Sequence, residues 1–518
     1  MGGVVVIGAG VGGCYAAFRL VTGSRNVTLY ESGYRAGGRI WSVPVRGGGW
    51  AELGAMRLNR EAAPVMALLD HLGLADSLTP FPFGRPENFV KARGNLIRQR
   101  DFADAVRIPY AVGKRSHGTD ADGLTLEAVE SAVPGFGRLR ETYHRAVRER
   151  RPADAASARA RYRTARGTAV VRGEPLEKVS WPQVLAAALD REALRLVADT
   201  GGYDVHTGGA APWIDVLFHT PPQAEYVTLS GGMQSLPRAL HSAFEAAGGR
   251  TRWGRRLCRV AFADRAGGPY ELTFALEDRT GRDTGRRERV RAGTVILALP
   301  QDALRRIRTE PGIVGPSWRD DLEAVEPVRA AKLFLAYDEP WWRACGVETG
   351  RSTTDLPLRQ LWYAPGGAPR LLLAAYPSGP SAAFWDRFGA GPPYHVPGGT
   401  DTFDGGPPAP AAAVAHAHRL LCHMHGVRAR PPVAACRQDW GRPPYPAAWH
   451  IWRTGRATEE LAARMRAPAS MGAPASGGAL YVVSDCWTPD PGSIPGTLGC
   501  AEQVLREHLA LPRPPWPT

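Results

Sequence analysis

Lysine is scarce in this sequence of 518 residues, because only four of its 64 lysine and arginine residues are lysines. Arginine therefore supplies nearly all of the positive charge. The net charge of +14 is spread along the chain and is not gathered into one basic block. Proteins that bind nucleic acid usually concentrate such charge on one face, so we expect no nucleic-acid partner. The four lysines are Lys91, Lys114, Lys178 and Lys332.

Paired cysteines and long apolar runs are also missing. The seven cysteines form no C-x-x-C pair and no zinc-like spacing, so we expect no metal site and favour free thiols in a reducing compartment. No run approaches the roughly 18 apolar residues of a membrane span. The chain opens on a strand pattern with no signal-peptide features. We therefore expect a cytoplasmic protein that does not enter a membrane.

The size and composition are those of a folded protein with more than one core. A chain of 518 residues exceeds the usual limit for a single hydrophobic core. Its hydrophobic content of 44% and charged content of 22% are ordinary for globular proteins. Two interwoven or sequential domains are therefore expected.

The first apolar stretch, VVVIGAGVGGCYAAFRL, carries the spaced glycines Gly8, Gly10 and Gly13. An apolar run of this kind predicts a parallel strand buried on both faces, followed here by a helix. Glycines at this spacing let the backbone approach a pyrophosphate at the helix N-terminus. A second strand pattern, NVTLYES, ends at Glu31, where an acid that binds ribose is expected. A chance glycine turn is the alternative, but the four agreeing features favour a dinucleotide site.

Two motifs after the second strand indicate which dinucleotide is bound. They are RAGGRIWS at residues 35–42 and AELGAMRLN at residues 51–59. The sequence here resembles the flavin-containing amine oxidase family, and the E-L-G-A-M-R form resembles its L-amino acid oxidase branch. The resemblance implies an FAD cofactor. The residues implied to contact it in these motifs are Gly38, Arg39, Gly54, Ala55 and Met56.

The resemblance continues to the C-terminus. TLSGGMQSLPRAL at residues 228–240 and TVILALP at residues 294–300 are similar to family segments. RRLCRVAF is similar to the strand whose valine, here Val260, lies near the adenine, and ALYVVSDCW delivers Asp485 toward the ribityl or pyrophosphate region. Ile494, at the start of the last helix pattern, is a further expected cofactor contact. The departure is at residues 492–496, where G-S-I-P-G replaces a common aromatic residue and acid.

The resemblance implies an α/β fold with amine oxidase architecture. A Rossmann-like FAD-binding domain, discontinuous over residues 1–59, 228–300 and 470–518, would be interwoven with an α+β substrate-binding domain at residues 301–469. Residues 60–227, which contain several helix patterns, would form a helical and substrate-facing portion. A homodimer is left open.

Two cationic side chains are the expected catalytic residues. Arg57, in the G-A-M-R element, matches the arginine that grips the substrate carboxylate in the family's L-amino acid oxidases, and a guanidinium suits that task. Lys332 matches a strand lysine that holds a water beside flavin N5. Strand alternation places it on one face with Phe334 and Ala336. A surface arginine and a lysine snorkelling from a strand end remain the structural alternatives.

Three aromatic residues are candidate substrate contacts. The segment STTDLPLRQLWYAP is similar to a family strand that carries such an aromatic residue, and only one of Trp362 and Tyr363 can face the pocket from a regular strand. Alignment through the Arg-Gln pair favours Trp362. Tyr203, in GGYDVHTG, is similar to a position in bacterial L-tryptophan oxidases of pigment pathways. Each of the three is also explained as a core residue.

The leading functional hypothesis is an FAD-dependent L-amino acid oxidase of secondary metabolism. It would use O2 to convert an amino acid, for example an aromatic one such as tryptophan, into the imino and then the 2-oxo acid, with ammonia and hydrogen peroxide. The FAD is expected to be non-covalent, because no cysteine matches the family's linkage motif. The alternatives are an amino acid 2-monooxygenase, an amine or polyamine oxidase, which Arg57 disfavours, and a flavin-binding protein without turnover.

Overall fold

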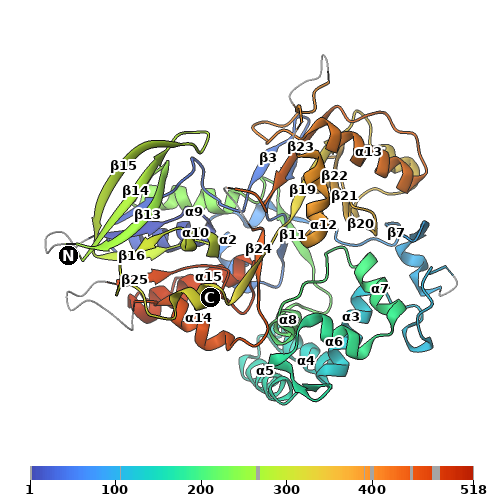
Figure 1. The fold of residues 1–518 in the computed structure, drawn as a ribbon, viewed down its shortest axis with the longest axis horizontal. Helices are drawn as coiled ribbons and strands as arrows, with labels where there is room; N and C mark the ends of the chain where they lie inside the picture. Colours follow the sequence, from blue (N-terminus) through green and yellow to red (C-terminus); the bar gives the residue numbers. More distant parts are fainter. Residues whose placement is uncertain are drawn as a thin grey trace.

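The chain folds into a mixed α/β structure with several sheets. We describe it from a computed structural model over residues 3–104, 107–263, 269–389, 391–396, 402–443, 447–469 and 479–516. Figure 1 shows two halves: one holds a parallel sheet and a smaller antiparallel sheet, and the other holds a large sheet beside a group of helices. Residues 470–478, at the expected start of the last FAD-binding segment, lie outside the described residues.

The predicted first strand lies at the centre of a five-stranded parallel sheet. It pairs with the strands expected from NVTLYES and TVILALP, and the latter pairs in turn with the strand expected from ALYVVSDCW, although these segments are distant in sequence. The apolar runs therefore form a parallel sheet, as predicted. In spatial order the strands are β12 (Arg250–Arg252), β2 (Val27–Tyr30), β1 (Val4–Ile7), β16 (Thr294–Leu297) and β25 (Ala479–Val482).

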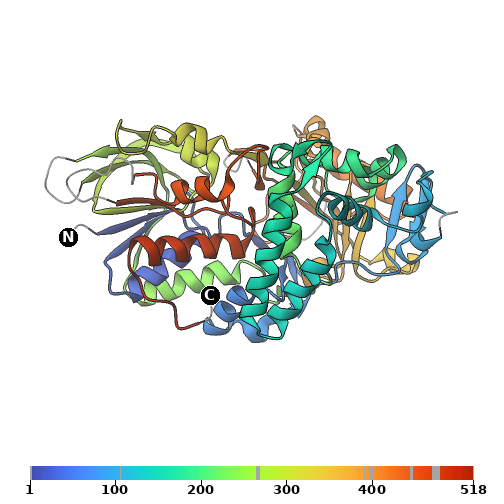
Figure 2. The same ribbon diagram turned by 90° about the horizontal axis from the view of Figure 1, so that it is seen from below.

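Three helices cover one face of this sheet and place two helix N-termini near its carboxyl edge. Helix α1 (Val11–Thr22) packs against both α9 (Ser235–Ala246) and α15 (Ile494–Gln503), and Figure 2 shows them in one layer below the strands. Their apolar faces bury Leu29, Leu240 and Phe244 completely. On the other face lies an antiparallel extension of β15 (Asp283–Ala292), β14 (Tyr270–Glu277) and β13 (Arg255–Phe262), with β17 (Arg308–Thr309) at its edge.

A seven-stranded sheet forms the second half of the molecule. Along β19 (Ala331–Ala336), Leu333 and Leu335 pack toward α13 (Ala411–His425), while Phe334 and Ala336 belong to a separate cluster on the opposite face. This alternation confirms the predicted orientation of the strand. The other strands are β23 (Ala434–Asp439), β22 (Leu371–Ala375), β21 (Gln360–Tyr363), β20 (Gly350–Thr354), β7 (Phe89–Ala92) and β8 (Asn95–Arg98).

Residues 60–227 contribute helices and also strands. The helices from α3 to α8 pack around a core of their own beside the large sheet, whereas α2 packs into the core of the parallel-sheet half. Because β7 and β8 join that sheet, the segment also takes part in the strand layer of residues 301–469. Its helices are α2 (Ala63–His71), α3 (Ala121–Ala132), α4 (Phe136–Arg148), α5 (Pro152–Gly167), α6 (Trp181–Ala188), α7 (Arg191–Thr200) and α8 (Ala210–His219).

Short elements join the two halves near the middle of the molecule. The hairpin of β3 (Ser42–Pro44) and β4 (Trp50–Glu52) precedes β5 (Leu58–Asn59), which pairs through β11 (Tyr226–Leu229) with β6 (Leu78–Pro80). A separate antiparallel pair is formed by β18 (Val325–Val328) and β24 (Trp449–Trp452). The remaining helices are α10 (Gln301–Arg305), α11 (Trp318–Leu322), α12 (Gly379–Ala383) and α14 (Thr458–Arg466), and the remaining strands are β9 (Val170–Val171) and β10 (Glu174–Pro175).

Within the described part of the chain, no helix combines the length and apolarity that a membrane crossing requires. All seven cysteines lie in that part and are free thiols.

Candidate active site

A cavity of about 2330 Å³ runs between the two halves. One end lies at the carboxyl edge of the parallel sheet, against the β1–α1 turn, and the other reaches helices α3 and α8. Most of the predicted site residues line it, although they come from segments far apart in sequence. They are Gly8, Gly10, Glu31, Gly38, Arg39, Gly54, Ala55, Met56, Arg57, Tyr203, Lys332, Asp485 and Ile494.

The glycine turn is shaped for close approach of a ligand. Gly8 has φ +102°, and a Cβ on it would lie 2.4 Å from the carbonyl oxygen of Ala298. A Cβ on Gly13 would lie 1.8 Å from the carbonyl oxygen of Gly8, so this glycine permits α1 to pack on the strand. Gly10 faces open space and caps α1 without a side-chain hydrogen bond. The first N–H groups of the helix therefore point toward the cavity, which suits an anion.

Glu31 is fixed at the end of β2. Its Oε2 accepts a hydrogen bond from the backbone N–H of Ala9 at 2.6 Å, and its Oε1 accepts one from Gly33 at 2.8 Å. These bonds hold the carboxylate beside the glycine turn. The carboxylate can accept hydrogen bonds from the ribose hydroxyl groups of a dinucleotide, while the neighbouring helix N-terminus suits its phosphates.

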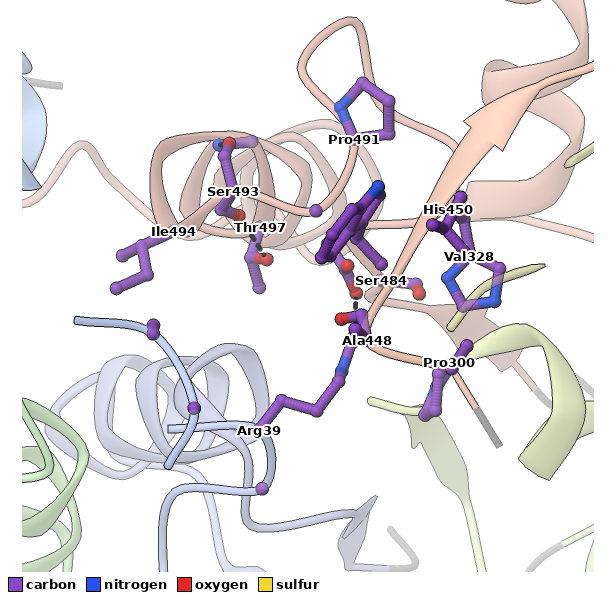
Figure 3. A pocket seen from close by; sticks show the side chains of 18 of the residues that line it. Arg39, Pro300, Val328, Ala448, His450, Ser484, Pro491, Ser493, Ile494 and Thr497 are labelled. Carbon is purple, nitrogen blue, oxygen red and sulfur yellow. Dashed lines mark hydrogen bonds and ion pairs between the residues drawn. The ribbon is translucent and has the colours of Figure 1, made fainter. Parts of the chain in front are cut away.

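Arg39 and Asp485 form a partly buried ion pair in the cavity wall, and Figure 3 shows Arg39 extending toward Ala448 and Ser484. Arg39 also donates to the carbonyl oxygen of Ala448 at 3.0 Å. Burial works against both charges, but their mutual attraction outweighs it. The pKa of Arg39 is therefore raised and that of Asp485 is lowered. Both groups stay ionised next to the N-terminus of α15.

His450, Asp485 and Cys486 form a compact buried cluster with potential ligand atoms within 4.8 Å of one another. The Cys486 thiol lies 3.2 Å from His450 Nδ1, and Asp485 is engaged by Arg39. Burial, reinforced by Asp485, raises the pKa of Cys486 to about 12, and burial lowers that of His450 to about 3. A protonated thiol and an engaged carboxylate favour a hydrogen-bonded cluster over a metal centre.

Lys332 lies in the wall of the cavity where the two halves meet. Only 2% of it is exposed, and its Nζ donates to the carbonyl oxygens of Glu52 at 2.9 Å and Gly54 at 2.6 Å. Burial lowers the pKa of Lys332 to about 7; the charge of Arg57 adds to this effect and that of Glu52 opposes it. The third ammonium hydrogen is not used by these two bonds. Lys332 can therefore exchange a proton near neutral pH.

Arg57 is held in a cage of aromatic rings. Its guanidinium carbon lies 4.9 Å from the ring centroid of Phe83, 5.1 Å from that of Tyr226 and 5.4 Å from that of Trp362. Burial works to lower the pKa of Arg57, but neighbouring tyrosines, first of all Tyr203, outweigh it and raise the pKa. The guanidinium is therefore a permanent, oriented charge at the cavity wall.

Trp362 and Tyr363 point to opposite sides of β21. Trp362 lies on the same side of the strand as Arg57, and its ring contacts the guanidinium. The hydroxyl of Tyr363 instead donates to Ser352 Oγ at 2.9 Å and lies 2.8 Å from His425 Nε2 in the core on the other face. Neither is among the described residues that line the cavity. The structure therefore brings Trp362, but not Tyr363, to the arginine.

Two cofactor candidates lie behind the cavity wall. Val260 is fully buried in the core between the parallel sheet and its antiparallel extension, where it packs with Leu272. Leu257, on the same strand, is the apolar residue that lines the cavity. Gly13 likewise lies one turn into α1, behind the lining.

Sequence analysis missed two aromatic residues that complete the pocket. The ring of Tyr203 lies 5.6 Å from that of Tyr376 at 84° and 5.6 Å from that of Trp449 at 81°. Lys332 Nζ lies 4.8 Å from the ring centroid of Tyr376. Tyr376 follows β22 and Trp449 begins β24, neither of which carries a recognised motif. Their only local signal is a place at one end of a strand, which does not by itself mark a pocket residue.

The fold and cavity together define a protein that can hold an extended anionic cofactor beside a small pocket of cations and aromatic rings. The chain belongs to the flavin containing amine oxidoreductase family, whose family model matches residues 11–497. Membership implies a flavin cofactor. The expected family is therefore confirmed.

Several relatives are L-amino-acid oxidases. That of Vipera ammodytes ammodytes is 26% identical over 369 residues, which cover 70% of this chain and 66% of that protein. The enzyme of Mus musculus is 26% identical over 388 residues, which cover 73% and 54%. The chain thus spans just under two thirds of the first and about half of the second. Achacin of Lissachatina fulica is 23% identical over 493 residues, covering 87% and 83%.

The fold is also found among solved structures. Putrescine oxidase bound to putrescine superimposes with a TM-score of 0.65 at 17% identity, covering 98% of this chain and 99% of that one. At this identity the likeness concerns the fold alone.

Proposed function

We propose that the protein is an FAD-dependent L-amino acid oxidase. The observation that carries the proposal is that Arg57 and Lys332 line one cavity with the glycine turn and Glu31. A caged, permanently charged guanidinium suits a substrate carboxylate, and a simple amine gives it no partner. The L-amino-acid oxidase relatives support the same substrate class.

The residues at the sheet end of the cavity fit FAD. The uncapped N-terminus of α1 suits the pyrophosphate, and Glu31 suits the ribose. The ion pair of Arg39 and Asp485, with the N-terminus of α15, would hold the middle and flavin portions. We propose non-covalent binding, because burial raises the pKa of Cys486 to about 12 and that of Cys500, which lines the cavity, to about 11, so that neither offers a reactive thiolate near neutral pH. The proposed domains are a discontinuous FAD-binding domain, a substrate-binding domain at residues 301–469, and a helical, substrate-facing portion at residues 60–227.

When bound, FAD would accept the hydride, with its two electrons, that leaves the substrate Cα, and O2 would reoxidise the reduced flavin to give hydrogen peroxide. The chain's own residues do the rest. Arg57 grips the carboxylate and fixes the position of Cα. Lys332 holds a water through its remaining N–H and exchanges a proton near neutral pH. The rings around Tyr203 exclude bulk water from the amine, so that it reacts in its neutral form.

The products would be the imino acid, its 2-oxo acid, ammonia and hydrogen peroxide. An aromatic substrate such as tryptophan is our choice, supported by the ring-lined pocket and by the resemblance of the segment around Tyr203. A 2-monooxygenase would release CO2 and an amide from the same site. The putrescine oxidase fold keeps an amine oxidase as a second candidate, but that protein's diamine has no carboxylate for Arg57.

An anaerobic absorbance titration with the twenty L-amino acids tests the proposal. Bleaching of the yellow protein by one or a few amino acids, with ammonia and peroxide released on admitting air, is the expected result. CO2 in place of peroxide would reassign the protein to the monooxygenases. Bleaching by diamines alone, or by no amino acid and no amine, would refute the proposal.

A further inference from the structure

The turn before the last helix carries no aromatic side chain that could form a wall of the pocket. Its G-S-I-P-G sequence includes Gly492, whose φ is +77°. A Cβ on Gly492 would lie 2.6 Å from the Cβ of Trp449, closer than two such atoms approach. The space beside the turn is therefore taken by Trp449. A side chain at residue 492 and the observed place of Trp449 exclude each other.

Trp449 comes from a different part of the fold. It is the first residue of β24, whose backbone is fixed by antiparallel pairing with β18, where Trp449 lies opposite Val328. Figure 3 shows the loop through Pro491 bordering the same cavity as His450 of β24 and the preceding Ala448. The strand therefore places the indole where the loop has only glycine.

The indole completes a set of rings around the candidate reaction site. The rings of Trp449 and Tyr376 each pack edge-to-face with Tyr203, at interplanar angles of 81° and 84° and with 5.6 Å between ring centroids. All three line the cavity, together with Arg57 and Lys332. A pocket of apolar walls with a few fixed polar groups is the usual form of a small-molecule site. An indole wall would cover the substrate against water and limit the directions in which its side chain can lie.

We infer that Trp449 is a substrate-facing wall and a determinant of substrate selectivity, and that Gly492 is required to leave it in place. This inference rests on the proposed function. The wall comes from a residue of strand β24, whereas the family resemblance places an aromatic residue in the turn before the last helix. Trp449 would contact the substrate, whereas Gly492 acts only through Trp449.

The test compares the holoenzyme with two pairs of variants. Trp449→Ala is paired with Trp452→Phe on the same strand, because Trp452 donates to Thr488 in the core and is not among the described lining residues. Gly492→Ala is paired with Gly455→Ala. Gly455 has a similar φ of +75°, but a Cβ there meets nothing within 4 Å. Each pair therefore separates the effect of losing or displacing the indole from the effect of general damage to the fold.

Two readouts are needed, one of which does not require turnover. The dissociation constant of benzoate is measured from the change in flavin absorbance, and kcat/KM is measured across the amino acids that bleach the wild type. Trp449→Ala should raise the benzoate Kd and lower kcat/KM for the best substrate by about tenfold, the scale of one lost aromatic contact. Trp449→Phe should recover most of this loss. Gly492→Ala should follow Trp449→Ala, and the two controls should follow the wild type.

Three outcomes are decisive. The inference is overturned if Trp449→Ala binds benzoate and ranks amino acids as the wild type does. It is equally overturned if Gly455→Ala loses as much as Gly492→Ala, because strain alone would then explain the effect. A wild type that binds benzoate but is bleached by no amino acid would refute the proposed function. The benzoate Kd values of the variants would still test whether Trp449 forms a wall of the pocket.

Discussion

Replacing Arg57 tests the substrate class most directly. Arg57→Ala removes the guanidinium that lies within about 5 Å of three ring centroids. A carboxylate held through two charge-assisted hydrogen bonds would lose both. At about 1.5–3 kcal/mol for each such bond, the loss is about 3–6 kcal/mol. This corresponds to a kcat/KM that is lower by roughly 10²- to 10⁴-fold.

The assay compares each amino acid with the amine that lacks its carboxylate, for example tryptophan with tryptamine. Arg57→Ala should lower kcat/KM for the amino acid and leave that for the amine nearly unchanged. Arg57→Lys should recover only part of the loss, because a single ammonium cannot make two parallel bonds or stack on the rings. FAD content should stay at the wild-type level, because the substitution leaves the glycine turn, Glu31 and the Arg39–Asp485 ion pair unchanged.

The neighbouring Arg351 provides the matched control. Its guanidinium lies 4.3 Å from the ring centroid of Phe83, the ring that also contacts Arg57, but Arg351 is outside the set of described lining residues. Arg351→Lys should retain the preference for amino acids over amines. Equal losses for amino acid and amine in Arg57→Ala, or no loss for either, would show that the arginine does not bind a carboxylate.

The remaining predictions concern Lys332. Burial lowers the pKa of Lys332 to about 7 and raises that of the neighbouring Glu52 to about 7, so the pH profile of kcat/KM should contain an ionisation of this pair near neutrality. Lys332→Met should lower the rate by roughly a hundredfold, as for a lost proton-transfer group, and should move the remaining ionisation to higher pH, because Glu52 loses the cation that lowers its pKa. An ionisation that keeps its position in Lys332→Met would be assigned to another group. The negative charge of Glu52 raises the pKa of Lys332, so Glu52→Gln should shift the same ionisation to lower pH, and a shift to higher pH would contradict the assigned coupling.

The residues that the local motifs predicted for the framework of the site line one cavity. Gly8, Glu31 and Arg39 belong to short segments in which strand, turn and acid follow one another, so local sequence already determines their relative placement. Lys332 was found because lysine is rare and because strand alternation set its face. In each of these cases the relevant spacing is a few residues along one element.

The rest of the pocket depends on contacts that no local pattern encodes. Tyr376 and Trp449 meet Tyr203 only because β22, β24 and the segment after α7 converge at one edge, far apart in sequence. The same applies to Tyr363 and Val260, whose strands were expected but whose side chains turn toward cores. Alternation limits a strand to two faces, but only the packing of neighbouring sheets decides which face is the cavity.

The scarcity of lysine is explained at position 332 by the shape of its surroundings. The ammonium fits between the carbonyl oxygens of Glu52 and Gly54 and the ring of Tyr376. A guanidinium is larger and planar, and its charge would be permanent beside the charge of Arg57. A chain that uses arginine almost everywhere for positive charge therefore needs two different cations here. Under the proposed function, Arg57 stays charged to hold the substrate carboxylate, whereas Lys332 is small and able to lose its proton in a buried place.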